Sequence, residues 1–255
     1  MKLFDCNAML GTWKQNTGDC YETAEEFLCA MDEAEIDKSL VYGSLAKFND
    51  AHDGNIELLD LTRGHERLIP CAAAIPHHTG EFPDPEAFSQ FLRENKIPAV
   101  RIFPVFHGLN LIGWLWGELF AMLEKLKTPL IIDLNITHFS NEVDFEGIEK
   151  ICARYSELPV VLTRMSVRSV RYLYPMMAMH SNLYIETSLY TAFDGLHGFA
   201  EKFGAERLLF GSNMPIANPN AAKATVLLGD LTDEQKSMIA GENLERLLKE
   251  VKYYG

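Results

Sequence analysis

The 255-residue sequence lacks paired cysteines and long apolar runs. Its five cysteines are scattered, odd in number and without a Cys-x-x-Cys pair, which favours reduced thiols over a disulfide framework. No apolar run approaches the roughly 20 residues that cross a membrane, and Asp5 interrupts the N-terminal stretch that a signal peptide would need. We therefore expect a cytoplasmic protein that has no membrane partner.

Basic residues are also scarce. Lys and Arg number 23 against 36 Asp and Glu, so the formal net charge is −13. A charge of this sign argues against nucleic acid or an anionic membrane as the main partner. Nucleotide-binding signatures are missing as well: no Gly-x-Gly-x-x-Gly follows the first apolar segment, and there is no phosphate-loop lysine motif. An open doubly wound sheet is therefore the less favoured arrangement.

Eight short apolar segments alternate with helical patterns along the chain. The expected strands span residues 2–7, 38–44, 68–75, 99–103, 130–135, 160–164, 183–188 and 208–213. The expected helices begin near residue 23 and span residues 54–62, 85–95, 115–127, 145–155, 167–179, 196–203, 220–228 and 233–249. Strict alternation implies parallel strands, and eight such units need about 250 residues. We predict one domain over residues 1–255, an α/β protein with a single (β/α)8 TIM barrel and an extra C-terminal helix.

Polar residues interrupt five of the predicted strands, mostly near their C-terminal ends. They are Arg101, Asp133, Asn135, Arg164, Glu186, Ser188 and Asn213. TIM barrels build their active sites at this end of the strands. Taken singly, each of these residues is equally well explained as a hydrogen-bonded structural group. Their convergence from five strands predicts a pocket for a small polar ligand.

Six segments carry a resemblance to a known family. They are residues 4–11 (FDCNAMLG), 129–133 (PLIID), 158–165 (LPVVLTRM), 182–188 (NLYIETS), 207–215 (RLLFGSNMP) and 239–248 (IAGENLERLL). Together they resemble the amidohydrolase superfamily, in particular its branch of small-molecule hydrolases, lactonases and decarboxylases. The resemblance implies divalent ions held by two histidines of strand one, histidines ending strands five and six, and an aspartate of strand eight. That aspartate also takes a proton from the attacking water.

The sequence departs from this pattern at every metal-ligand position. The five positions read Asn7, Met9, Asp133, Arg164 and Asn213. Only Asp133 is a good ligand for a divalent ion, Arg164 places a permanent cation in the cavity, and Asn213 cannot ionise. Strand four offers Arg101 instead of a lysine that could be carbamylated to bridge two metals. We therefore expect a degenerate site with no metal and no other cofactor.

Three hypotheses address what replaces the metal. Arg164 and Asp133 could pair in its place, either to serve ligand binding or as a structural plug. Arg101 and Arg164 could bind a carboxylate or phosphate. The histidines that follow strands three to five, His77, His78, His107 and His138, could form a displaced metal site or supply an acid or base, or else be solvated loop residues.

These interpretations define the predicted site and function. The predicted catalytic residues are Asp133, Arg164 and Asn213. The predicted ligand-binding residues are Asn7, Met9, Arg101, Asn135, Glu186, Ser188, His107 and His138. We expect a metal-independent hydrolase or lyase for a small carboxylated or lactone-type substrate. The alternative is a non-catalytic ligand-binding or assembly protein. The resemblance also implies a possible homodimer.

Overall fold

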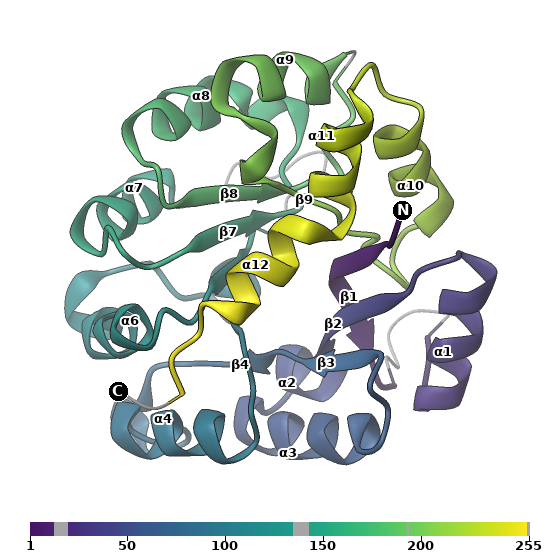
Figure 1. The fold of residues 1–255 in the computed structure, drawn as a ribbon. Coiled ribbons are helices and arrows are strands. Elements are labelled where there is room, and N and C mark those ends of the chain that lie inside the picture. The colour runs from purple at the N-terminus through teal and green to yellow at the C-terminus, as the bar shows by residue number, and fades with distance from the viewer. Residues whose placement is uncertain (13–19, 135–142, 193, 254–255) are drawn as a thin grey trace.

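The computed structural model describes residues 1–12, 20–134, 143–192 and 194–253. Strands form a central barrel with helices around it (Figure 1). The strands are β1 (Phe4–Leu10), β2 (Lys38–Gly43), β3 (Leu68–Pro70), β4 (Ala72–Ala73), β5 (Val100–Ile102), β6 (Leu130–Asp133), β7 (Val160–Thr163), β8 (Leu183–Glu186) and β9 (Leu208–Leu209).

Helices follow the strands and cover the outside of the barrel. The longer ones are α1 (Ala24–Glu33), α3 (Ala51–Thr62), α4 (Pro85–Glu94), α6 (Gly113–Leu126), α7 (Phe145–Arg154), α8 (Val170–Met179), α9 (Gly195–Phe203) and α10 (Pro219–Leu227). Two short helices, α2 (Ser44–Phe48) and α5 (Pro104–His107), directly follow β2 and β5. The C-terminal segment consists of α11 (Asp233–Ser237), a π-helical turn (Met238–Glu242) and α12 (Asn243–Lys249).

Hydrogen bonds between the first and last strands close the barrel. On one side of Cys71, β3 pairs with β2, and on its other side β4 pairs with β5, so β3 and β4 act as one strand. The strand pairs are all parallel. The Cys6 N–H donates to the Phe210 carbonyl at 2.9 Å, and Ala8 forms a parallel bridge with Met214. The predicted (β/α)8 TIM barrel is therefore confirmed.

Capping residues mark the N-termini of outer helices near the positions predicted from the sequence. Thr23 caps α1 through a capping box with Glu26, which satisfies two of the N–H groups that a helix start leaves free. Asp84 accepts a hydrogen bond from the Ala87 N–H at 2.9 Å at the start of α4, and Pro85 occupies the first turn, where its missing N–H costs nothing. These helices therefore begin within one or two residues of their predicted starts.

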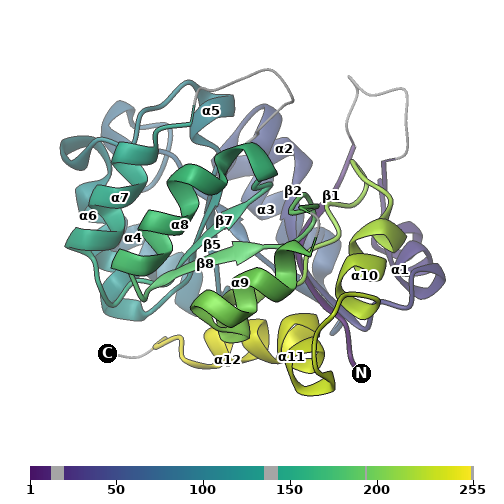
Figure 2. The same cartoon turned by 90° about the horizontal axis from the view of Figure 1, so that it is seen from above.

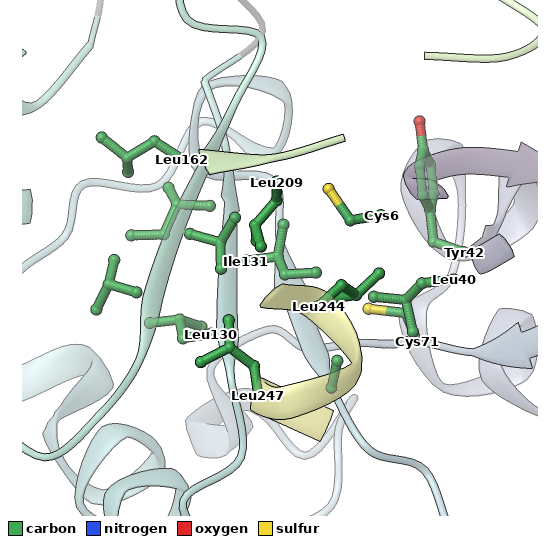
Figure 3. Close-up of a cluster of buried hydrophobic side chains, with 14 of the residues drawn as sticks. Cys6, Leu40, Tyr42, Cys71, Leu130, Ile131, Leu162, Leu209, Leu244 and Leu247 are labelled. Carbon is green, nitrogen blue, oxygen red and sulfur yellow. The ribbon is translucent and has the colours of Figure 1, made fainter. Parts of the chain in front are cut away.

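The two ends of the barrel differ in chemistry. At the end where the strands begin, Leu244 and Leu247 of α12 lie against Leu130 and Leu209 (Figure 3). The C-terminal segment thus seals this end with apolar side chains. Figure 2 shows α2 and α5 at the opposite end, where the strands finish. The polar residues therefore lie at the other end of the barrel, at the carboxyl ends of the strands.

Several elements differ from their predicted form. The predicted third strand is split at Cys71, and β9 ends at Leu209, short of Asn213, which has a left-handed backbone with φ 57°. The predicted closing helix contains the π-helical turn, and α2 and α5 were not predicted. In the described part of the chain, no helix combines the length and the apolar character needed to cross a membrane.

Candidate functional site

Arg101 is the centre of a buried polar network inside the barrel. Its Nη2 donates hydrogen bonds to Asn7 Oδ1 at 2.7 Å, to Thr163 Oγ1 at 3.0 Å and to Asp133 Oδ2 at 3.1 Å. The guanidinium also lies 4.1 Å from the ring centre of Tyr42, a cation–π distance. Burial lowers the pKa of Arg101, but the Asp133 carboxylate together with Tyr42 and Cys71 outweighs this, so the pKa is raised above its ordinary value. Arg101 therefore stays charged.

Arg101, predicted to bind a ligand, lies inside the barrel. The residue is 1% exposed, and one of its terminal nitrogens already serves three acceptors from three different strands. In the sheet register Arg101 lies opposite Ile131, so its long side chain reaches forward along the barrel to Asp133. Arg101 cross-links the interior and does not face the mouth.

The predicted pairing of Arg164 with Asp133 exists, but only as the longest of three contacts. Arg164 Nη1 lies 4.0 Å from Asp133 Oδ1, whereas Arg101 lies at 3.1 Å and Lys47 Nζ at 3.6 Å from Oδ2. Arg164 has a left-handed backbone with φ 62°, which turns the chain out of β7 immediately after Thr163. Its side chain is 12% exposed, more than those of Lys47 and Asp133. Asp133 is thus surrounded by three cations.

Lys47 is the site residue that sequence reasoning missed. It belongs to α2, outside any strand, so the search for polar residues within strands did not include it. The available signal was its position four residues after the end of the buried strand β2, at the same end of the barrel as Asp133. Its carbonyl accepts a hydrogen bond from His107 Nε2 at 2.9 Å. Lys47 is a third cation near Asp133. Its Nζ lies nearest Oδ2, whereas Arg164 lies nearest Oδ1.

Glu186 is fully buried on the other side of Asn7. Its carboxylate accepts hydrogen bonds from Asn7 Nδ2 at 3.0 Å, from Ser188 Oγ at 2.9 Å, from the Ser188 N–H, and from the Arg164 N–H at 3.2 Å. A side chain at Gly211 would overlap this carboxylate, so glycine is required there. Burial raises the pKa of Glu186, and its hydrogen bonds only partly offset this. Ser188 and Asn7 therefore hold Glu186.

A second buried carboxylate, Asp5, ties β1 to the segment after β9. It accepts hydrogen bonds from the Ser212 hydroxyl, from the Ser212 N–H at 2.8 Å and from the Asn7 N–H at 2.9 Å. Burial raises its pKa as well. The Asn213 N–H donates to the Asn7 carbonyl at 2.8 Å. Asn213 is thus held beside Asn7, and asparagine tolerates its left-handed backbone better than most residues.

The remaining residues singled out in the sequence fall into four groups. Met9 is 1% exposed within β1, in the apolar core. His107 lies beside Phe103 and Phe106 and contacts Lys47, and burial lowers its pKa, which favours the neutral ring. His77 stacks on His78 and lies 3.6 Å from Glu118 of α6. Asn135 and His138 lie outside the described residues.

The network does not offer a set of metal ligands. Within residues 1–12, 20–134, 143–192 and 194–253, no three His, Cys, Asp or Glu side chains gather in a way that could hold a metal ion. Asn7 is committed to Arg101 and Glu186, and Asp133 to its cations. A divalent ion would have to enter a space that Lys47, Arg101 and Arg164 already make positive.

Residues 64–249 match the amidohydrolase family. The chain belongs to this family. Among curated proteins, none matches the sequence.

Similar solved structures are TIM-barrel proteins of nearly the same length. An uncharacterised TIM-barrel protein from Bordetella bronchiseptica superposes with a TM-score of 0.77 at 16% identity, over 98% of this chain and 99% of that one. A dihydroxybenzoic acid decarboxylase from Polaromonas, with bound manganese and an inhibitor, gives 0.74 at 13% identity over 97% of each chain. A probable 2-pyrone-4,6-dicarboxylic acid hydrolase from Acinetobacter baumannii, with citric acid bound, gives 0.70 at 17%, over 98% of this chain and 100% of that one. These similarities support the fold.

Proposed function

We propose that this amidohydrolase-family protein is a metal-independent hydrolase or lyase for a small carboxylated or lactone-type substrate. The observation that carries the proposal is the gathering of Lys47, Arg101 and Arg164 within 4.0 Å of the single carboxylate of Asp133. Like charges close together repel, so this site disfavours a further cation and favours an anion. The positive charge that a metal would supply is here part of the chain.

In this proposal the chain's own residues take the catalytic roles. For a lactone, water adds to the carbonyl carbon and gives a proton to Asp133. The guanidinium of Arg164 stabilises the oxyanion that forms, as charged donors do in water-excluded sites. The ring C–O bond then breaks and the leaving oxygen takes the proton from Asp133, which leaves a hydroxy acid and restores the carboxylate. Asn213 cannot act as a base, but its amide can donate and accept hydrogen bonds that orient the substrate.

The structural neighbours support the proposed substrate class. They include a 2,6-dihydroxybenzoate decarboxylase, a 5-carboxyvanillate decarboxylase and the probable pyrone-dicarboxylic acid hydrolase. For a decarboxylation, the bond to the carboxyl carbon breaks, carbon dioxide leaves, and the remaining carbon takes up a proton. One neighbour contains bound manganese, whereas the described residues of this chain include no group of three His, Cys, Asp or Glu side chains that could hold such an ion.

A non-catalytic binding or assembly protein is the second candidate. It is favoured by the burial of Asn7, Arg101, Asp133 and Glu186, each at most 1% exposed, because these described side chains fill the axis of the barrel themselves. A network that serves only to hold the barrel together would look the same. Catalysis and binding must therefore be measured separately.

Four further expectations belong to the same proposal. We propose that residues 1–255 form one domain and that the protein works in a reducing cytoplasm. The second point agrees with its five free cysteines. The partner would be a small anionic molecule, and the protein could act as a homodimer.

The test is a set of small carboxylates and lactones in buffer that contains a chelator. Binding is measured by thermal shift and calorimetry, and turnover by proton NMR of the mixtures. We expect at least one carboxylate to bind, and Arg164→Met to weaken it. Arg63→Met is the matched control, since the Arg63 side chain is 78% exposed and pairs with Asp60 on the surface. Binding with turnover supports the enzyme, binding without turnover supports the second candidate, and no binding contradicts both.

A further inference from the structure

Lys47 has a largely buried side chain whose ammonium group makes no hydrogen bond to a described residue. The residue is 2% exposed, and its Nζ lies 3.6 Å from Asp133 Oδ2, beyond hydrogen-bond distance. No hydrogen bond from this nitrogen to another described residue is present. An ammonium has three N–H donors, and buried donors are costly unless an acceptor satisfies them. The N–H donors of Lys47 are therefore available to an acceptor from outside the chain.

Four aromatic rings surround the same nitrogen. Nζ lies 5.3 Å from the ring centre of Phe103, 5.5 Å from Phe48, 5.7 Å from Tyr42 and 5.9 Å from Phe106. Ring faces stabilise the positive charge but accept no conventional hydrogen bond. Three of these residues are largely shielded, whereas Phe106 is 40% exposed. The ring cage is thus open to solvent on the Phe106 side.

The backbone that carries Lys47 is rigidly placed. A side chain at Gly54 of α3 would overlap the backbone of Ala46, so α2 and α3 pack at the closest possible distance. His107 Nε2 holds the Lys47 carbonyl from α5. Phe106 and Phe48 contact each other at 5.0 Å between ring centres. Lys47 is therefore fixed before any ligand arrives, which reduces the entropy cost of binding.

We propose that Lys47 is the carboxylate-binding and specificity-determining residue of this site. Its ammonium donates to the ligand carboxylate, and the rings of Phe48 and Phe106 contact an apolar or unsaturated group attached to that carboxylate. Asp133, on the far side of the ammonium, repels extra negative charge, so a monoanion is preferred over a phosphate dianion. The substrate class is a small carboxylate with an unsaturated body. This inference rests on the proposed function.

The test compares binding of benzoate, acetate and inorganic phosphate to four proteins by isothermal titration calorimetry. Lys47→Met keeps the length of the side chain but removes its charge and donors. Lys47→Arg keeps the positive charge and the hydrogen-bond donors. It provides a second variant in case Lys47→Met fails to fold. Lys223→Met is the matched control, because Lys223 also forms one ion pair, at 2.7 Å with Glu35, on the outer surface. We expect wild type to bind benzoate more tightly than acetate or phosphate.

We expect Lys47→Met to bind benzoate about 10- to 100-fold more weakly than wild type, which is the effect of losing a hydrogen bond to a charged group. The affinity of Lys47→Arg should lie between those of wild type and Lys47→Met. Lys223→Met should bind benzoate as wild type does. If wild type binds benzoate and Lys47→Met binds it equally well, the role of Lys47 is wrong while the proposed function stands. If wild type binds none of the carboxylates, both are wrong.

Discussion

At the scale of single residues, Arg101 and Arg164 have opposite roles although both are cations near Asp133. Arg101 is buried and connects Asn7, Thr163 and Asp133, whereas Arg164 is partly exposed and lies at the limit of ion pairing. Removing one partner of a buried charge pair leaves the other charge uncompensated. The network should therefore depend on Arg101 for stability and on Arg164 for binding.

We predict that Arg101→Met lowers the free energy of unfolding by about 3–5 kcal/mol. Arg164→Met should lower it by no more than about 1 kcal/mol, because its ion pair is long and partly solvated. Urea denaturation followed by circular dichroism measures both. Equal losses from the two substitutions would show that Arg164, and not Arg101, holds the interior together.

Glu186 leads to a prediction about pH. Burial raises its pKa in the folded protein above the ordinary value of 4.5, so the unfolded chain ionises first as pH rises. Wild type should then lose stability relative to Glu186→Gln as pH rises from about 4.5 to the raised folded pKa, and the difference should stay constant above it. Urea denaturation of both proteins between pH 4 and 8 measures this. A gain in the stability of wild type relative to Glu186→Gln over this pH range would contradict the assignment.

The sequence identifies some of these residues and misses others for physical reasons. Glu186 and Asp133 stand out because a charged residue in an apolar strand must have a buried partner. Lys47 does not stand out, since a lysine after a strand is usually solvated. The burial of Arg101 and the turned backbone of Arg164 depend on the register between strands, which the sequence pattern does not specify.

At the scale of elements, α2 is positioned by its contact with α3. Gly54 lies against Ala46, one residue before Lys47. We predict that Gly54→Ala destabilises the protein by about 1–3 kcal/mol through overpacking, and that it also weakens carboxylate binding. Gly198→Ala in α9 is the control, because a side chain there meets nothing within 4 Å. The control should be stabilising by about 0.5–1 kcal/mol.

Thermal unfolding and calorimetry on the two glycine variants separate these effects. If Gly54→Ala is as stable as Gly198→Ala, α2 is not held by this contact, and the fixed position of Lys47 loses its explanation.

The closing segment leads to another prediction. Asn243 of α12 donates to the carbonyls of Ala205 and Leu208, both at 2.9 Å, and so ties α12 to the start of β9. We predict that Asn243→Ala lowers the free energy of unfolding by about 1–3 kcal/mol, because two buried carbonyls lose their donor. Asn95→Ala, which removes an exposed hydrogen bond to Phe91, should change it far less. Chemical denaturation checks this, and equal effects would contradict it.

The element pattern was predictable because apolar strands and capped helices are local signals. The interruptions were not. The break at Cys71 arises because β3 pairs with β2 and β4 with β5, a change of partner made by the closing barrel. The π-helical turn lies against the start of β1, where Gly241 approaches the Lys2 carbonyl and Phe4. Such features depend on packing between distant segments.

At the scale of the whole molecule, the barrel separates an apolar end from a polar one. The closing segment covers the end where the strands begin (Figure 3), and the cations gather around Asp133 at the end where the strands finish. The chain as a whole carries a formal net charge of −13. A local positive field within an acidic protein can attract a small anion despite the overall charge.

The central claim is that cations of the chain take the place of a metal ion. Inductively coupled plasma mass spectrometry tests it most directly, on protein incubated with manganese and zinc, desalted, and compared with a chelator-treated sample for melting temperature. We predict far less than one metal ion per chain and the same melting temperature in both samples. One tightly bound divalent ion per chain, with a lower melting temperature after chelation, would contradict the account.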